Sequence, residues 1–306
     1  MVTTVSDPAG DSRGRATDPL AAPLVSVIVP TYNRSALLRQ ALQSILRQDY
    51  PSVQAIVVDD GSGDDTAAVV QGFPSVEYLR QANAGPSAAR NLGQRAARGE
   101  YIGFLDADDL WDVDFLSTAV ACLRSHADVA FACANWRGVD GAGSTVMYAD
   151  KFRGFRSHML EYGREVAHDW RTLTHAEARS LFVRHSAAPP SATVIRRQCA
   201  QHGWDPVARV GEDRLFFFGA IMHSGLGAAF CMTPHWSHRG GCGNEYFGRQ
   251  SALVIERDIY AKRQLLSLYG GRLSRSERAT LHAGLGESYF DLAYSRAGSR
   301  QWLAAL

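Results

Sequence analysis

Three carboxylates stand within four positions of the segment YIGFLDADDLW (residues 101–111), at Asp106, Asp108 and Asp109. Two such charges about 5 Å apart repel each other by roughly 3 kcal/mol at an effective dielectric constant near 20. Solvent, a helix N-terminus or a bound cation would offset that repulsion. Asp106 and Asp108 can approach one cation from a turn, and Asp109 can add a third contact. Because oxygen-only ligands select hard ions, Mg²⁺ or Mn²⁺ is the expected cation.

Helix capping is the competing explanation for this acidic segment. Asp109 suits the N-cap of a helix that we predict over about 110–125, with Asp112 in its first turn. Capping explains part of the role of Asp109, but it does not explain Asp106 and Asp108. Both explanations therefore stay open at the level of these residues alone.

A second acidic stretch, DDGSGDD, occupies residues 59–65. Ser62 and Asp65 have the capping-box spacing for a following helix, and the glycines permit a tight turn. Asp59 and Asp60 are not needed for that cap. A carboxylate at a strand end can accept an N–H from a nucleobase, and Asp60 is the residue that we expect to do so.

One aromatic residue near these acids has two possible roles. Tyr32 follows Pro30 in the sequence PTYNR. Its ring could stack on a nucleobase, or it could fill a gap beside the next helix.

The elements that must position these side chains alternate between strand and helix. Apolar, β-branched runs predict the strands, the first of them stopped by Pro30, and apolar residues at helical spacing or glycine stops indicate the helices. We expect strands at 24–29, at the start of 54–65, and at 76–80, 101–105 and 128–134, with helices at about 38–46, 65–72, 85–99 and 110–125.

This alternation predicts an open, mostly parallel α/β sheet flanked by helices through about residue 135. Ligands bind such sheets beyond the carboxyl ends of the strands. The clusters PTYNR, DDGS and DADD follow the first, second and fourth strands, so we expect them to meet at one edge. The middle, about 138–188, is irregular, strand and helix patterns return over 189–232, and helical patterns from about 250 predict a C-terminal extension.

The composition limits the classes of function. The chain has 306 residues, 46% of them hydrophobic, and a formal net charge of +1, which gives no electrostatic case for nucleic acid. No apolar run approaches the roughly 20 residues of a membrane span. The first 22 residues have no signal-peptide core and are predicted to be disordered.

Five cysteines, an odd number in a long chain, favour a reduced cytoplasmic protein over a disulfide scaffold. Four residues with the spacing C-x3-H-x2-H-x3-C would permit a zinc site, although this spacing matches no common zinc module. They are Cys231, His235, His238 and Cys242.

Longer stretches of the chain resemble a known family. VSVIVPTYNRSALLRQALQSILRQ, AIVVDDGSGDDT, NAGPSAARNLGQRAARGEYIGFLDADDLW and VGEDRLFF are similar to the inverting nucleotide-sugar glycosyltransferases of the GT-A fold, the family 2 type. The resemblance covers about 24–135 and resumes at about 189–219. It implies an enzyme that moves a sugar from a nucleoside-diphosphate sugar, with UDP-sugars as the default donors, to an acceptor hydroxyl.

The resemblance also implies site roles by position. The nucleobase would contact Tyr32 and Asp60, and Asp106 would lie near the ribose and the metal waters. The metal would be held by Asp108, helped by Asp109. Other residues at donor-site positions are Pro30, Thr31, Asn33, Gly85, Arg90 and Ala107.

Two further segments complete the implied site. In VGEDR, Asp213 matches the family's catalytic base and is preceded by Glu212. A protein base of this kind takes the proton of the attacking hydroxyl, and direct attack inverts the anomeric centre. The segment 235–245 resembles the loop that folds over the donor phosphates, so His238 could reach the metal and Arg239 a phosphate. That resemblance weighs against zinc, and the loop's glycines make it a candidate lid.

The implied organisation is a tail over 1–22, a GT-A domain over 23–249 and a helical region over 250–306. The GT-A domain divides into a nucleotide-binding half (23–135) and an acceptor-binding half (136–249).

A saccharide, a glycolipid or a small molecule is the expected acceptor. The processive synthases' Q-x-x-R-W motif and membrane helices are missing, which favours one transfer per binding event. We expect a cytoplasmic enzyme, with the inner membrane face as an alternative location and the C-terminal helices as a candidate dimer contact.

Two rival functions remain at this stage. A sugar-nucleotide pyrophosphorylase has a related architecture, but its G-x-G-T-x-x-R loop would fall where this chain reads PTYNRSA. A non-catalytic nucleotide-sugar-binding homologue would have lost acids, whereas Asp60, Asp106, Asp108 and Asp213 are all in place.

Overall fold

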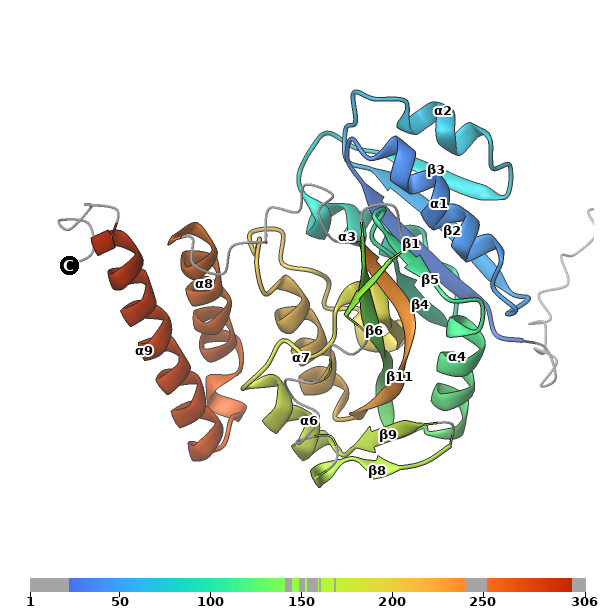
Figure 1. Cartoon of the computed structure of the whole chain (residues 1–306). Helices are drawn as coiled ribbons and strands as arrows, with labels where there is room; N and C mark the ends of the chain where they lie inside the picture. Colours follow the sequence, from blue (N-terminus) through green and yellow to red (C-terminus); the bar gives the residue numbers. More distant parts are fainter. Residues whose placement is uncertain are drawn as a thin grey trace, which may run out of the picture.

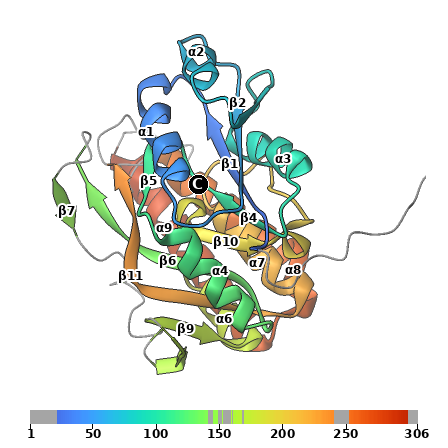
Figure 2. The same cartoon turned by 90° about the vertical axis from the view of Figure 1, so that its right-hand side faces the viewer.

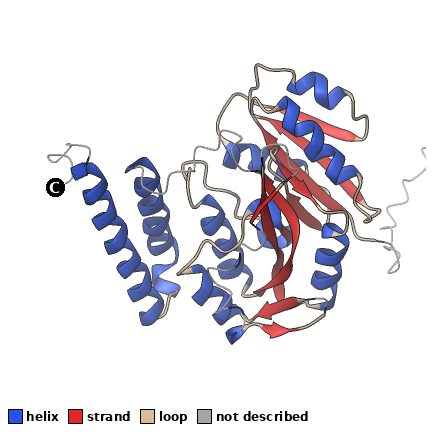
Figure 3. Cartoon of the chain, in the orientation of Figure 1, coloured by secondary structure: helices blue, strands red, loops and turns tan. Residues whose placement is uncertain are grey.

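The computed structural model of the chain describes residues 22–140, 145–148, 152, 159, 161–167, 169–239 and 252–298. Within these residues one mixed sheet of 11 strands forms the centre of the molecule, and helices cover both of its faces (Figure 3). The predicted α/β class is therefore confirmed. Of the predicted tail, only residue 22 lies among the described residues.

Four parallel strands form the N-terminal half of the sheet, in the order β3-β2-β1-β4. Side chains of β1 are buried on both faces, which explains the unbroken apolar run in its sequence. The strands are β1 (Val25–Thr31), β2 (Val53–Asp59), β3 (Val76–Arg80) and β4 (Tyr101–Phe104).

Pro30 does not stop β1, contrary to the sequence-based expectation. The strand runs on to Thr31, and Pro30 is paired with Val58 of β2. Ile28 faces β4, because its carbonyl accepts from the N–H of Leu105, and Pro30 faces the same side two residues further on. Since β4 has ended there, the missing N–H of Pro30 costs no ladder hydrogen bond.

The helices between these strands lie close to their predicted positions. Helix α1 buries Leu38, Ala41, Leu42 and Ile45, four of the residues whose spacing predicted it. In Figure 1, α1 and α4 lie on one side of the sheet and α3 and α7 (Glu212–Ser224) on the other. The first four helices are α1 (Ser35–Leu46), α2 (Thr66–Gln71), α3 (Pro86–Ala96) and α4 (Phe115–Ser125).

Two capping predictions are wrong. Asp109 caps no helix, because it begins the short strand β5 (Asp109–Trp111), which pairs with β11 (Gly227–Arg239). The N-cap of α4 is Asp114. The N-cap of α2 is Asp65, whose side chain makes no capping bond, and the hydroxyl of Ser62 accepts instead from the N–H of Asn33.

The second half of the sheet is mixed rather than parallel. Strand β10 (Thr193–Arg196) lies antiparallel between β4 and β6 (Val129–Val139), so β6 does not extend the N-terminal parallel set. Strand β11 runs parallel to β6 and antiparallel to β9. The remaining strands are β7 (Val146–Tyr148), β8 (Arg164–Glu165) and β9 (Trp170–Leu173).

The other helices pack on this second half and beyond it. A capping box made by Thr174 and Glu177 starts α6, and α7 buries nearly its whole length. They are α6 (His175–Phe182), α7, α8 (Ala252–Tyr269) and α9 (Arg275–Gly298), with short 3₁₀ turns at Pro190–Ala192, Arg197–Ala200 and Gly270–Arg272.

The C-terminal helices α8 and α9 pack against each other beyond α7, away from the sheet (Figures 1 and 2). Tyr269 at the end of α8 meets Phe218 of α7 edge to face, with ring centroids 5.4 Å apart. None of the helices that the structure describes is both long and apolar enough to span a bilayer. The predicted helical extension is confirmed, while the domain boundary at 250 remains a prediction.

Gly227 provides a test of the packing that holds β11 in place. A Cβ atom at this position would lie 1.8 Å from the carbonyl oxygen of Leu173 in β9. We expect Gly227→Ala to lower the free energy of unfolding by about 1–3 kcal/mol, measured by urea denaturation. Gly286→Ala on α9 is the matched control, because no atom lies within 4 Å of its new Cβ. Equal stability of the two variants would contradict the packing described here.

Candidate active site

A cavity of about 570 Å³ opens at the carboxyl ends of β1, β2 and β4. The polar clusters that follow these three strands meet there, as their positions in the sequence predicted. Most of the predicted site residues line it: Pro30, Thr31, Tyr32, Asp60, Gly85, Arg90, Asp106, Ala107, Asp108 and Glu212. The other lining residues are Arg34, Asn83, Pro86, Ala89, Arg209 and Arg257.

The side of the cavity beyond β2 is built on Asp60. Its carboxylate accepts from the side chain of Gln81 at 2.8 Å and from the N–H groups of Ala84 at 2.8 Å and Gly85 at 2.7 Å. Those bonds fix the chain that leads into α3. A carboxylate has about four acceptor sites, so one stays open for a ligand N–H. Tyr32 is 49% exposed beside it, which leaves its ring free to stack on a base.

Neighbouring residues hold this turn without lining the cavity. Asn33 has a φ of 51°, and its side-chain oxygen accepts from the N–H of Gly63 at 2.8 Å. Asp59 accepts from the N–H of Ser62 at 2.7 Å and from the hydroxyl of Tyr78 at 2.6 Å. Burial would raise the pKa of Asp59, but these bonds and the charge of Arg80 outweigh it and lower the pKa. Asn33 therefore has a supporting place in the structure.

Arg90 connects the acids on the two sides of the cavity. Its guanidinium is buried, donates to Asp106 at 2.8 Å and lies 3.6 Å from the carboxylate of Glu212. It also lies over the indole ring of Trp204, 4.7 Å from the centroid. The charges of Asp106 and Glu212 raise the pKa of Arg90 against the effect of its burial, so this cation stays charged.

The acidic turn after β4 directs its side chains in different directions. Asp106 and Asp108 line the cavity, whereas Asp109 is only 3% exposed and its carboxylate bonds the ring of His238 at 3.0 Å. Burial and the charge of Asp106 raise the pKa of Asp108. Burial raises the pKa of Asp109 to about 6, against the effect of its bond to His238.

The residue types at this turn fit a hard divalent cation. The negative charge of Asp106 helps to raise the pKa of Asp108, and a nearby cation would relieve that repulsion. The groups that Asp106 and Asp108 offer to a metal are carboxylate oxygens, which hard divalent ions prefer. Asp109, as placed, faces His238 instead. Among the described residues no three His, Cys, Asp or Glu side chains converge as a complete metal cage, so other ligands would have to come from the bound substrate or water.

Arg239 does not lie where a residue that contacts the donor phosphate was expected. Its guanidinium is fully buried and donates to the carbonyl oxygen of Asp108 at 2.8 Å and to the side chain of Gln40 at 2.9 Å. We therefore correct its expected role, since it supports the acidic turn from behind. His238 also faces this turn: burial lowers its pKa, but Asp109 and the other acids outweigh that effect and raise it.

The zinc arrangement is not formed by the residues that the structure describes. Cys231, His235 and His238 all belong to the extended strand β11. At about 3.3 Å per residue, the first and last of them lie roughly 20 Å apart and cannot share one ion. Cys242 and the candidate lid glycines lie outside the described residues.

The first turn of α7 supplies the remaining predicted residues. Burial and the charge of Asp213 raise the pKa of Glu212 to about 7, against the effect of Arg90. Burial also raises the pKa of Asp213, against its hydrogen bonds from Ser186 and the N–H of Arg214. Asp213 is half-buried next to Glu212, but it is not among the residues that line the cavity.

The sequence analysis missed several cavity residues. Arg34 lies inside the PTYNR motif and Arg209 three residues before the VGEDR acids, so proximity to a motif was an available signal. Nothing in the sequence pointed to Arg257. The structure also explains Gly85, whose φ of 92° is one that residues with a side chain rarely adopt.

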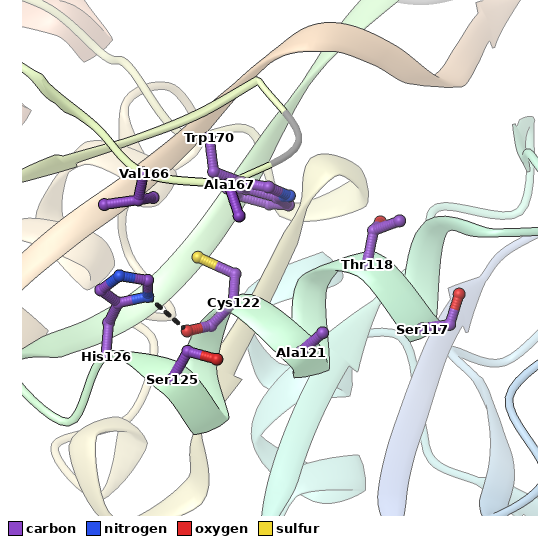
Figure 4. A pocket seen from close by; sticks show the side chains of 9 residues that line it. All are labelled: Ser117, Thr118, Ala121, Cys122, Ser125, His126, Val166, Ala167 and Trp170. Carbon is purple, nitrogen blue, oxygen red and sulfur yellow. Dashed lines mark hydrogen bonds between the residues drawn. The ribbon is translucent and has the colours of Figure 1, made fainter.

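A second cavity, of about 380 Å³, lies between α4 and the segment leading into β9 (Figure 4). It is lined mainly by apolar and small side chains, with Cys122, His126 and Trp170 among them. The described residues that line it include no carboxylate and no guanidinium. The acidic cavity is therefore the candidate for chemistry on a charged substrate.

Comparison with known proteins gives the family. The family model described as glycosyl transferase family 2 matches residues 26–203. This chain belongs to that family.

Curated relatives match over part of their length. A GalNAc(5)-diNAcBac-PP-undecaprenol beta-1,3-glucosyltransferase of Campylobacter jejuni is 40% identical over 116 residues, which cover 36% of each protein. Glycosyltransferase GlyA of Streptococcus pneumoniae is 40% identical over 111 residues, 35% of this chain and 16% of that protein.

Solved structures share the GT-A fold. The S. aureus TarS fragment 1–349 in complex with UDP-GlcNAc has a TM-score of 0.64 at 20% identity, over 92% of this chain and 79% of that one. The mannosyltransferase PcManGT of Pyrobaculum calidifontis, in complex with GDP-Man and Mn²⁺, has a TM-score of 0.62 at 22% identity, over 94% and 77%. These similarities confirm the fold expected from the sequence.

The raised pKa of Glu212 leads to a pH-dependent prediction. Between pH 4.5 and about 7 the folded state holds a proton that the unfolded chain has lost, so the stability falls as the pH rises through this window. Glutamine does not titrate, so the Glu212→Gln variant does not lose stability in this way. Its free energy of unfolding relative to wild type should rise by up to about 3 kcal/mol from pH 4 to pH 8. Urea unfolding at each pH measures it.

The matched control is Glu287→Gln, an exposed glutamate on α9. Its stability should follow the wild-type pH profile. A difference between Glu212→Gln and wild type that does not change with pH would contradict a raised pKa for Glu212.

Proposed function

We propose that this enzyme transfers a sugar from a nucleoside-diphosphate sugar to an acceptor hydroxyl by single displacement with inversion, and that a divalent cation assists. One observation carries the proposal: a single cavity is lined by the exposed ring of Tyr32, the carboxylate of Asp60, the acidic turn at 106–108 and Glu212, which precedes Asp213 at the start of α7. UDP-sugars are the first donor candidates. Two structural neighbours bind UDP-GlcNAc and GDP-Man, which supports a nucleotide sugar and leaves the sugar open.

In this proposal the nucleobase lies between Tyr32 and Asp60. The ring of Tyr32 supplies stacking, and the open acceptor site of Asp60 binds an N–H of the base. The ribose lies toward Asp106, whose place is set by Arg90 and by the bond from the Asp106 N–H to the hydroxyl of Ser191 at 3.1 Å. Residues from β1, β2 and β4 thus bind the nucleotide along the edge of the sheet.

Asp106 and Asp108 are the residues that would hold the divalent cation, Mg²⁺ or Mn²⁺. Such a cation would offset the negative charge that develops on the departing diphosphate. His238 lies next to this turn through its bond to Asp109, which we assign to support rather than to direct contact.

Asp213 acts as the general base. As the acceptor oxygen forms its bond to the anomeric carbon, its proton passes to the Asp213 carboxylate. The bond from the anomeric carbon to the phosphate oxygen breaks, and its electron pair leaves with the nucleoside diphosphate. A base with a raised pKa suits this task at neutral pH, and burial raises the pKa of Asp213.

The acceptor is a saccharide, a glycolipid or a small molecule, and one sugar is transferred per binding event. We assign the enzyme to the cytoplasm, including the inner face of the membrane as a place of action. The cysteines that the structure describes are free and buried, which suits a reducing compartment. We also assign a dimer contact to α9, where Phe290 and Tyr294 are 72% and 77% exposed.

Nucleotide binding tests the proposal directly. Thermal unfolding is measured with UDP, GDP, dTDP and their sugars, with and without Mn²⁺. A ligand that binds only the folded state raises the melting temperature, so one nucleotide series should stand out, and more strongly with Mn²⁺. In Asp108→Asn, the part of the rise in melting temperature that depends on Mn²⁺ should be lost. The control variant Asp291→Asn, on α9, should retain it. If no nucleotide shifts the wild-type transition, the proposed function is wrong.

Asp213→Asn tests the base. Loss of a general base lowers the rate by about 10²–10⁴-fold. We expect kcat to fall by that factor while the Kd of the donor stays within about twofold, measured by turnover and calorimetry on one preparation. Asp291→Asn should behave as wild type. Turnover at the wild-type rate in Asp213→Asn would assign the base elsewhere.

A further inference from the structure

Helix α8 is anchored to the segment that leads into the active site. Gly211, directly before α7, has a φ of 73°, and a Cβ there would lie 2.9 Å from the Cβ of Ala261 in α8. The hydroxyl of Tyr260 donates to Asp205 at 2.9 Å. The backbone of α8 therefore passes close to the first residues of α7, and its position relative to the cavity is fixed by packing.

Arg257 lies on α8 one turn before Ala261, on the same side of the helix. It lines the cavity together with Asp106, Arg209 and Glu212. Within the part of the chain that the structure describes, Arg257 is half-buried and makes neither a hydrogen bond nor an ion pair.

Three other charged residues of α8 are paired within the helical extension. Lys262 bonds Asp258 at 2.7 Å, and Glu256 bonds Arg296 of α9 at 2.5 Å. The Arg257 guanidinium, in contrast, is directed at the cavity and is available to a ligand. A half-buried guanidinium at the wall of an open cavity is suited to an anion.

The charges around the cavity indicate which anion fits. Among the described residues, the carboxylates at its wall are those of Asp60, Asp106, Asp108 and Glu212. Arg90 already forms ion pairs with two of them, Asp106 and Glu212. A nucleoside diphosphate brings further negative charge next to these acids. Guanidinium groups bind phosphate oxygens bidentately. Arg209 and Arg257 contribute positive charge to the same cavity, from the chain before α7 and from α8.

We propose that Arg257, with Arg209, binds the diphosphate of the nucleotide donor, so that the C-terminal helix α8 forms part of the donor site. This inference rests on the proposed function, because it requires a nucleotide donor. It makes the helical extension a component of substrate binding and not only a packing partner of α7.

Calorimetry on the full chain tests the inference. The Kd of UDP, GDP or dTDP, whichever binds wild type most tightly with Mn²⁺, is compared with the Kd of its nucleoside for wild type, Arg257→Gln and Arg257→Lys. A hydrogen bond to a charged group corresponds to roughly a 10–100-fold change in affinity. We expect Arg257→Gln to weaken the diphosphate by about that factor and the nucleoside by less than about twofold, with partial recovery in Arg257→Lys.

Arg263→Gln is the matched control, an exposed arginine of the same helix that does not line the cavity. It should keep the wild-type Kd, and the melting temperatures of all variants should agree. A wild-type Kd for the diphosphate in Arg257→Gln would overturn the inference while leaving the proposed function intact. Failure of wild type to bind any of the three nucleotides would instead overturn the proposed function, and the inference with it.

Discussion

The buried guanidinium of Arg90 lies between the acidic turn that follows β4 and the first turn of α7. Without a cation there, the partly buried carboxylates of Asp106 and Glu212 would repel each other more strongly than they would in bulk water. The guanidinium of Arg90 packs on one face of the Trp204 ring. Trp204 is itself stacked on Phe216, with the ring centroids 4.0 Å apart. Asn91, one residue along α3, exchanges hydrogen bonds with the backbone of Trp204 at 2.7 and 2.8 Å. One helix thus positions the cation and anchors the chain segment on which that cation rests.

The mixed sheet explains why acids so far apart in sequence share one cavity. The parallel strands β1, β2 and β4 deliver their following turns to a common edge. Strand β10 then enters antiparallel beside β4, and the 3₁₀ turn before it supplies Ser191, which bonds the backbone of Asp106. Strand β11 reaches the same turn from the other side, through the bonds of His238 and Arg239. The acidic turn is therefore held by strands from both halves of the chain.

The sequence predicted the parts of the fold that depend on local pattern. The segments of β1, β2 and β4 are apolar runs of strand length, and the apolar residues of α1 recur at helical spacing. These patterns alone were enough to predict the four elements, and the structure confirms them. Its errors came from long-range pairing. Asp109 looks like a helix cap until β11, more than a hundred residues later, pairs with it as a strand. The spacing of Cys231, His235 and His238 looks like a metal set until an extended strand separates the three side chains.

The candidate site was predictable to the same extent. Asp60, Asp106 and Asp108 lie at strand ends, where topology alone brings ligands. The family resemblance pointed to Glu212, which lines the cavity, and to Asp213 beside it, which does not. Arg257 could not be found this way, because its place depends on how α8 packs against Gly211. The buried position of Arg239 depends likewise on the course of β11, which residue types do not specify.

Three main-chain hydrogen bonds hold the acidic turn, in addition to the side-chain bonds of Asp106 with Arg90 and of Asp109 with His238. The N–H of Asp106 binds Ser191, the carbonyl of Asp108 binds Arg239, and the N–H of Asp109 binds the carbonyl of Asp106. Replacing the side chain at 106 or 108 leaves these three bonds available. Evolution, or a protein engineer, can therefore exchange the chemical groups displayed at this edge while the peptide framework beneath them keeps its shape.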